Sequence, residues 1–350
     1  MNDNKPQFKK QYYPINAALQ TYLEKYKRVT KTNVFYDDLL RFQGSITVND
    51  KEGKDTLWIR VYYNEYEKIE LDNSLKKIYT LLHSDGDERN IQFLNVDYID
   101  FCTFGNSQPF RIKVRNILND NYTHFYIKKA DASRIFGLEL EHILSPNRIN
   151  FLVFEDTLIE EHIVGIPGDI FLEHNLKECS EHEKAQIAKE FVKFNERCMI
   201  GLLGDMRSYN FVIVPIYDFD QRVFKIRAID FDQQSYEGSF KLYKPHLFKE
   251  NFKFYQLVQT KLNQNAIEQY QSEERSILVK RLIDSEKRLK HLVQAMKSAK
   301  LAPKEHIKKL REEIYEFTLD LNFKKANSMG RIVEVALNYM KRNFKYEDYE

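Results

Sequence analysis

The sequence contains few cysteines, which argues against a zinc site and against a disulfide framework. Cys102, Cys179 and Cys198 are odd in number and widely spaced, whereas tetrahedral zinc sites favour paired CxxC spacing. Disulfides persist mainly in oxidising compartments. The nine histidines contain no HExxH pair, the usual helical zinc motif. We therefore interpret the cysteines as reduced structural thiols and expect no zinc site.

Long apolar runs and an excess of charge of one sign are also missing. No stretch approaches the ~18 apolar residues needed to span a bilayer, and residues 1–6 lack the apolar core of a signal peptide. With 54 Lys and Arg against 52 Asp and Glu, a nucleic-acid or anionic-membrane surface would require local clustering. The basic residues of 280–309 are interleaved with acids, which favours a solvated helical face. We expect a cytoplasmic protein without a transmembrane segment or a nucleic-acid partner.

The patterning that is present predicts an α+β fold. A chain of 350 residues with 43% hydrophobic content can bury one large core or two to three smaller ones. Helical spacing over 15–29 is followed by two strand-like runs, 45–48 and 57–62, around a polar turn. A second helix is predicted over 74–83. The polar residues that follow it suggest a boundary near residue 92.

The next segment alternates strands with one helix, and the remainder is mainly helical. Three strands, a helix and two strands are expected in the order 93–104, 110–114, 123–128, 131–144, 150–154 and 157–159. The run 165–168 contains two glycines and a proline, which cannot continue a central strand. Beyond it, apolar periodicity predicts helices over 181–199, 266–297, 303–320 and 328–342, with a hairpin over 211–230.

The most informative stretch combines three polar residues. Asp205 follows Gly204 on a turn, Asn210 comes five residues later, and Asp230 follows a strand-turn-strand segment. Phosphoryl transfer needs a carboxylate near the attacking hydroxyl and oxygen ligands for Mg²⁺, a hard cation. The three side chains can converge if residues 211–214 pair with 225–229. This spacing indicates a phosphotransferase centre.

These residues resemble the protein-kinase-like superfamily. Asp-x-x-x-x-Asn at 205–210, followed by Ile229-Asp230-Phe231, is similar to its catalytic loop and metal-binding Asp. Gly204-Asp205 in place of His-Arg-Asp resembles the aminoglycoside, choline and phosphoinositide kinase branches. The resemblance implies a bilobal fold that uses ATP and Mg²⁺, with Asp205 acting on the acceptor hydroxyl. Asn210 and Asp230 would hold the metal, and Asp232 is a possible extra ligand.

The resemblance extends upstream to residues that would bind the nucleotide phosphates. Phe125-Tyr126-Ile127-Lys128 resembles the Val-Ala-Ile-Lys strand, so Lys128 would contact the α and β phosphates, with Lys129 as the alternative if the register slips. The glutamate partner of this lysine is expected on the next helix. Glu139 fits that position best, and Glu141 is the fallback.

Two further segments resemble parts that enclose a nucleotide. The strand 157–165 is similar to the hinge that binds adenine, which would place Glu161, His162 and Ile163 at the base. The segment 103–109 is the candidate for the loop over the phosphates, with Gly105 and Ser107 as its contacts. The implied division is an N-terminal α+β segment (1–92), a small lobe (93–164) and a large lobe with a helical C-terminal extension (165–350).

Departures from the family pattern leave two alternatives open. The loop at 103–109 has a single glycine, Asp232 stands where the family usually has Gly, and no Ala-Pro-Glu or long activation segment follows. A hydroxyl-bearing small molecule is therefore favoured over a protein as acceptor. One alternative is a catalytically inactive pseudokinase that acts as a binding scaffold. The other is an enzyme that transfers a nucleotide instead of a phosphoryl group.

Overall fold

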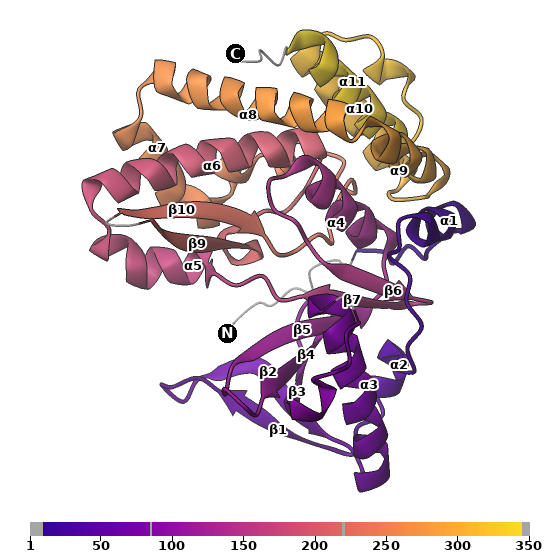
Figure 1. The fold of residues 1–350 in the computed structure, drawn as a ribbon. Helices are drawn as coiled ribbons and strands as arrows, with labels where there is room; N and C mark the ends of the chain where they lie inside the picture. Colours follow the sequence, from indigo (N-terminus) through magenta and orange to yellow (C-terminus); the bar gives the residue numbers. More distant parts are fainter. Residues whose placement is uncertain (1–9, 85, 219–220, 345–350) are drawn as a thin grey trace, which may run out of the picture. The chain divides into compact units, whose positions relative to one another are not determined.

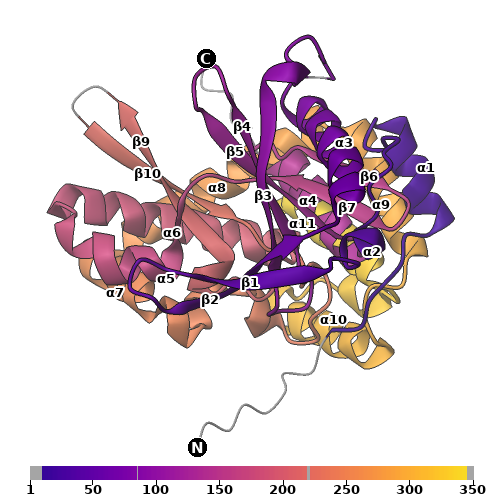
Figure 2. The ribbon, with the colours of Figure 1, turned by 90° about the horizontal axis from the view of Figure 1, so that it is seen from below.

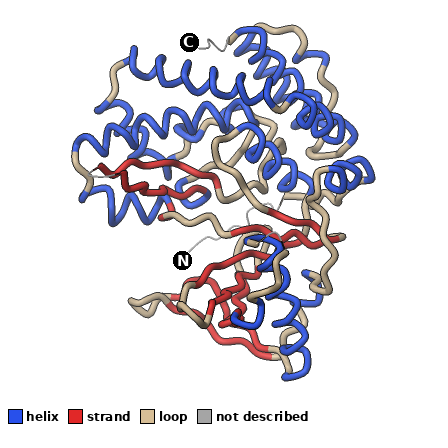
Figure 3. The backbone as a smooth tube through the Cα atoms, viewed as in Figure 1, coloured by secondary structure: helices blue, strands red, loops and turns tan. Residues whose placement is uncertain are grey.

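The protein has an α+β fold in the computed structural model, which describes residues 10–84, 86–218 and 221–344. Two compact units divide the chain. The first, unit 1, comprises the described chain up to Asp131 together with Ile149–His162, and the second, unit 2, comprises Ala132–Arg148 and the chain from Ile163 onward. Strands dominate unit 1 and helices dominate unit 2 (Figure 3). The predicted α+β class is confirmed.

Unit 1 contains an antiparallel sheet of seven strands (Figure 1). The strands are β1 (Gly44–Asn49), β2 (Asp55–Tyr62), β3 (Leu94–Cys102), β4 (Phe110–Asn116), β5 (Tyr122–Lys129), β6 (Phe151–Phe154) and β7 (Thr157–Glu161). Their spatial order is β1-β2-β3-β4-β5-β7-β6. The domain prediction assigned β2 and β3 to different segments, yet the two strands pair directly, with Trp58 opposite Cys102. The division into three parts itself stays a prediction.

One face of this sheet forms the core of unit 1. Alternate residues of β4 and β5, such as Ile112 and Phe125, are fully buried there because strand side chains point to opposite faces in turn. The helix α3 (Glu65–His83) supplies Leu75 and Ile78 to the same core (Figure 2). The two shorter helices of this unit are α1 (Ala17–Lys25) and α2 (Tyr36–Leu39).

The helix α3 begins nine residues earlier than the predicted 74. Its first turns are exposed, so they have no apolar periodicity; Tyr66 and Ile69 both face solvent. The start is fixed instead by Asn64, whose side-chain oxygen accepts a hydrogen bond from the backbone N–H of Glu67 at 2.9 Å. Such an N-cap satisfies one of the free donors at a helix start. The cap therefore sets a boundary that hydrophobic periodicity does not reveal.

Unit 2 combines a helical array with a small sheet. Its helices are α4 (Ala132–Leu144), α5 (Gly168–Ile170), α6 (Glu181–Gly201), α7 (Phe252–Lys261), α8 (Gln264–Asp284), α9 (Glu286–Ser298), α10 (Lys304–Thr318) and α11 (Met329–Asn343). Its strands are β8 (Ile166–Pro167), β9 (Phe211–Asp218) and β10 (Gln221–Ala228), in the order β10-β9-β8. The long helix α6 packs on β10 and also on α7 and α8 (Figure 1). The β9–β10 hairpin is thus held against α6, which in turn packs on α7 and α8.

One predicted helix of unit 2 differs from the structure in detail. The helical pattern over 266–297 is split at Ser285, which has φ −107° and separates α8 from α9. A serine favours helix ends because its side chain competes for backbone hydrogen bonds. Residues 166–167 form the two-residue strand β8 at the edge of the small sheet, in agreement with the prediction that 165–168 cannot continue a central strand. Among the described residues, no helix has the length and apolar character needed to cross a membrane.

Candidate functional site

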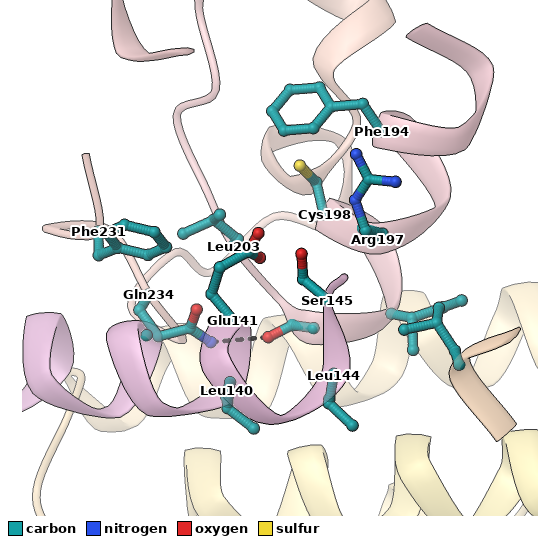
Figure 4. A pocket seen from close by; sticks show the side chains of 14 residues that line it. Leu140, Glu141, Leu144, Ser145, Phe194, Arg197, Cys198, Leu203, Phe231 and Gln234 are labelled. Atoms are coloured by element: carbon teal, nitrogen blue, oxygen red, sulfur yellow. Dashed lines mark hydrogen bonds between the residues drawn. The ribbon is translucent and has the colours of Figure 1, made fainter. Parts of the chain in front are cut away.

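The turn that follows α6 presents Asp205 in a strained backbone conformation. Leu202 ends the helix with φ 52°, and Asp205 has φ 56°. Residues other than glycine adopt such left-handed conformations at a cost of roughly 1–3 kcal/mol, commonly at functional sites. The turn is fixed by the segment that follows Asp230, since Gln234 donates from Nε2 to the carbonyl of Gly201 at 2.7 Å (Figure 4). The fold therefore holds Asp205 in place at an energetic cost.

Asp205 is bound on one side and open on the other. Arg207 donates from Nε to its Oδ1 at 2.6 Å, and the same guanidinium donates from Nη1 to Glu250 at 2.8 Å. The Asp205 side chain keeps one third of its surface exposed. Burial raises the pKa of Asp205, and the hydrogen bond from Arg207 opposes that rise. The carboxylate thus has a fixed orientation and a proton affinity above that of an ordinary aspartate.

Hydrogen bonds connect Asp205 to Asn210 and Asn210 to the strand that ends before Asp230. Asn210 donates from Nδ2 to the backbone carbonyl of Asp205 at 2.7 Å, and Ile229 donates its N–H to the carbonyl of Asn210 at 3.0 Å. The predicted pairing is present, with Phe211 opposite Ala228 in the β9–β10 register. The three predicted residues are therefore positioned by one continuous hydrogen-bonded segment.

The Tyr209 phenol lies in the electrostatic field of both Asp205 and Asp230. Burial raises the pKa of the Tyr209 phenol, and the carboxylates of Asp205 and Asp230 both add to the rise, whereas Arg207 opposes it. A phenol that responds to both carboxylates lies in the field of each. Tyr209 itself is nearly half exposed. Both carboxylates therefore disfavour ionisation of the Tyr209 phenol.

Asp230 and Asp232 are bound by an arginine that the sequence analysis missed. Arg134, at the start of α4, donates from Nη2 to Asp230 at 2.8 Å and from Nε to Asp232 at 2.9 Å. Its side chain is almost completely buried. Asp232 also donates its backbone N–H to Oδ1 of Asp230 at 3.0 Å. Two of the three predicted metal ligands, Asp230 and Asp232, therefore share one guanidinium.

The predicted lysine and glutamate of the phosphate-binding pair belong to different units, and each has a partner within its own unit. Lys128 donates to Glu160 of the neighbouring strand β7 at 2.6 Å, with both side chains buried. Glu139 has no exposed surface and accepts two hydrogen bonds from Nη2 of Arg288, at 2.7 and 2.9 Å. A direct pairing of Lys128 with Glu139 stays a prediction. Glu141, the fallback, lines a small cavity of unit 2.

The other predicted nucleotide contacts have ordinary structural surroundings. Lys129 is half exposed and lies 3.4 Å from Asp37, so it is a surface residue. Glu161 accepts the backbone N–H of Asn150 at 2.9 Å. His162 lies 3.1 Å from the hydroxyl of Tyr126, and burial lowers the pKa of its imidazole.

The predicted hinge and phosphate loop are connecting segments in the structure. Ile163 is the first residue of the main part of unit 2. Gly105 and Ser107 lie in the loop between β3 and β4. Gly105 has φ +86° and no neighbouring atom within 4 Å of where a Cβ would be. The positive φ is a conformation that glycine adopts at no steric cost, and the loop is open at Gly105.

The cavity behind the Asp205 turn is too small for a nucleotide. It has a volume of about 30 Å³ and is lined by α4, α6 and the residues Phe231 and Gln234 (Figure 4). Such a space holds a water molecule, whereas ligand pockets measure roughly 300–1,000 Å³. Within the described ranges, no group of three or more His, Cys, Asp or Glu side chains is arranged to hold a metal. A metal bound by Asp230 and Asp232 would therefore also need the amide oxygen of Asn210 as a ligand.

Gly168 supports the turn that contains Asn210, and its replacement provides a test of that support. A Cβ on Gly168 would lie 2.6 Å from the carbonyl oxygen of Ser208 and 2.6 Å from the ring of Phe211. We expect Gly168→Ala to lower the free energy of unfolding by about 1–3 kcal/mol, the usual cost of overpacking. Gly201→Ala is the matched control, since no atom lies within 4 Å of its Cβ position. Urea denaturation of both variants measures the difference, and equal stability would contradict close packing at Gly168.

Comparison of the sequence with protein-family models and with curated proteins finds no match. The functional argument therefore depends on the residues themselves. Sequence reasoning identified Asp205, Asn210 and Asp230 from their spacing. It missed Arg134 and Arg288, because neither lies near its carboxylate partner in the sequence. Arg207, two positions after Asp205, was close enough to be found.

Proposed function

We propose that this protein is an ATP- and magnesium-dependent phosphotransferase with a bilobal protein-kinase-like fold. It would transfer the γ-phosphoryl group of ATP to a hydroxyl of an acceptor, with a small molecule favoured over a protein. Asp205 would orient the hydroxyl and accept its proton as the bond to phosphorus forms and ADP leaves. Lys128 would contact the α and β phosphates. Asn210 and Asp230 would hold the metal.

One observation supports this proposal most strongly. Asp205, Asn210 and the strand that leads to Asp230 are joined by consecutive hydrogen bonds, and Asp205 stands in a strained conformation. Strained residues cost free energy and cluster at functional sites, so the conformation of Asp205 is an argument for function. The order of elements gives further support, because β3, β4 and β5 are followed by α4 and then by β6 and β7. That is the order of three strands, a helix and two strands that the resemblance implies.

The donor set fits magnesium. The Nδ2 atom of Asn210 is used by the Asp205 carbonyl, which leaves its Oδ1 as the ligand atom. Asp230 and Asp232 supply carboxylate oxygens, each group with about four lone-pair sites, so the bonds from Arg134 leave acceptor capacity. Hard cations prefer such oxygens. When bound, magnesium would supply positive charge that neutralises the phosphates.

A second candidate function is a pseudokinase that binds a partner without catalysis. The observation that favours it is the guanidinium of Arg134 on Asp230 and Asp232, which supplies a positive charge where the metal is expected. The conformational strain at Asp205 favours the enzyme, because a scaffold gains nothing from it. Transfer of a nucleotide instead of a phosphoryl group is the third possibility.

Magnesium-dependent ATP binding distinguishes the enzyme from the scaffold. A ligand that binds only the folded state stabilises it by about 2.7 kcal/mol at a concentration 100-fold above Kd. We therefore expect ATP with Mg²⁺, but not ATP alone, to raise the melting temperature by several degrees. The rise should disappear in Asp230→Asn and persist in Asp284→Asn, an exposed aspartate at the end of α8. ADP and GTP titrations give the nucleotide preference. No shift with any nucleotide would favour the scaffold.

A further inference from the structure

Arg134 occupies a position between two carboxylates that the proposed function assigns to a metal. Its Nη2 lies 2.8 Å from Oδ1 of Asp230 and 2.6 Å from Oδ1 of Asp232. Its Nε donates to the same oxygen of Asp232 at 2.9 Å. Hydrogen bonds between ionised partners are about twice as strong as neutral ones. The guanidinium is therefore a substantial part of the environment of both aspartates.

The Asp230 carboxylate and the backbone of the segment that follows it have contacts other than those with Arg134. Asp230 accepts the backbone N–H of Asp232 through Oδ1 at 3.0 Å, a local bond that fixes the side chain relative to its own turn. Gln234 ties the same segment to the end of α6 through the carbonyl of Gly201. The segment 230–234 would therefore keep its shape if the guanidinium moved away.

The backbone that carries Arg134 is held independently as well. A Cβ on Gly137, one turn further along α4, would lie 3.0 Å from Cβ of Phe231, so the helix and the 230–234 segment pack at close range. Farther along the helix, Glu139 is bound by Arg288 of α9. An arginine side chain has several rotatable bonds, whereas the helix that carries it is fixed at two points. Movement of the Arg134 side chain alone, without movement of α4, would withdraw its positive charge from the two carboxylates.

We propose that Arg134 is an intramolecular competitor of the divalent cation for Asp230 and Asp232. In the metal-free protein its guanidinium neutralises part of the charge of the two carboxylates, and an incoming Mg²⁺ or Mn²⁺ must displace it. The affinity for the metal then depends on the difference between the free energies with which the two carboxylates bind the metal and the guanidinium. This inference depends on the proposed function, since it concerns the same two aspartates.

The test is Mn²⁺ binding by the nucleotide-free protein, followed by the loss of the free-ion electron paramagnetic resonance signal. We expect Arg134→Gln to lower the Kd for Mn²⁺ at least ~10-fold relative to wild type, because the competing charge is gone. Arg134→Lys keeps a charge but not the planar fork, so its Kd should fall between the two. Arg288→Gln is the matched control: it removes another arginine bound to α4 but should leave the Kd unchanged.

The outcomes separate this inference from the proposed function. An Arg134→Gln or Arg134→Lys protein that binds Mn²⁺ no more tightly than wild type would overturn the competition, even if wild type binds ATP with Mg²⁺. Tighter binding in both Arg134 variants and in Arg288→Gln would also overturn it, because the effect would then be general loosening of α4. Tighter binding confined to the Arg134 variants, without ATP binding in any protein, would support competition and contradict the phosphotransferase.

Discussion

Replacement of Asp205 by Asn should lower ATP turnover by about 10²–10⁴-fold, the range for loss of a positioned general base. Asparagine keeps the size of the side chain but cannot accept the hydroxyl proton. The fold should survive, because Asn is one of the few residues that tolerate a left-handed conformation like the φ of 56° here. Arg207 also keeps its bond to Glu250. Turnover is measured as ADP release, with Asp284→Asn as the control.

The pH dependence of the same reaction gives a second readout. Burial raises the pKa of Asp205 above its ordinary value of 3.8, and a base must be ionised to act. The acid limb of the rate should therefore lie above the ordinary aspartate range and disappear in Asp205→Asn. Because the folded state holds this proton more tightly, the group lowers stability as pH rises from 3.8 to the raised pKa. Full turnover in Asp205→Asn, or an unchanged acid limb, would contradict the role of Asp205.

Removal of Arg288 should destabilise unit 2 by about 3–5 kcal/mol, the range for loss of one partner of a buried ion pair. Glu139 has no exposed surface, whereas the Arg288 side chain keeps one quarter of its surface. Arg288→Ala therefore withdraws charge-assisted bonds from a carboxylate that water does not reach. Glu139→Gln should cost less, because the arginine left behind is partly solvated.

Urea denaturation tests this asymmetry. Arg331→Ala is the control, since its pair with Glu334 is largely exposed and surface pairs contribute only about 0–1 kcal/mol. The double variant Glu139→Gln with Arg288→Gln should recover part of the stability lost in Arg288→Ala. In the double variant the buried residue 139 is neutral, so no buried carboxylate has lost its arginine. Equal losses in Arg288→Ala and Arg331→Ala would show that the Glu139 pair behaves as a surface pair.

Local pattern predicted most of the elements, but it predicted their boundaries only where one face is regularly buried. Strands β4 and β5 and the helix α6 lie within about two residues of the predicted ranges, since each has one regular buried face. The start of α3 was missed because exposed turns and an Asn64 cap give no periodicity. The break at Ser285 was missed because apolar spacing continues across it.

In the candidate site, local relations between residues close in sequence could be predicted, whereas contacts between residues far apart in sequence could not. Asp205 and Asn210 are five residues apart and joined by a hydrogen bond, and the predicted pairing of the strands that lead from Asn210 to Asp230 is present. Arg134 meets Asp230 across 96 residues, and Arg288 meets Glu139 across 149. Contacts at such separations depend on helix packing, which a single sequence does not express. The arginines that pair with Asp230 and Glu139 could therefore not be predicted from the sequence.

The most direct test of the central claim is phosphorus NMR of ATP incubated with the wild-type protein and Mg²⁺. Kinase-like enzymes transfer the γ-phosphoryl group, so the account predicts slow conversion of ATP to ADP and inorganic phosphate without an acceptor, with water as the attacking hydroxyl. Conversion should require Mg²⁺ and should be lost in Asp205→Asn. Formation of AMP or pyrophosphate would contradict phosphoryl transfer in favour of nucleotide transfer. Unchanged ATP, despite binding, would contradict the enzyme in favour of the scaffold.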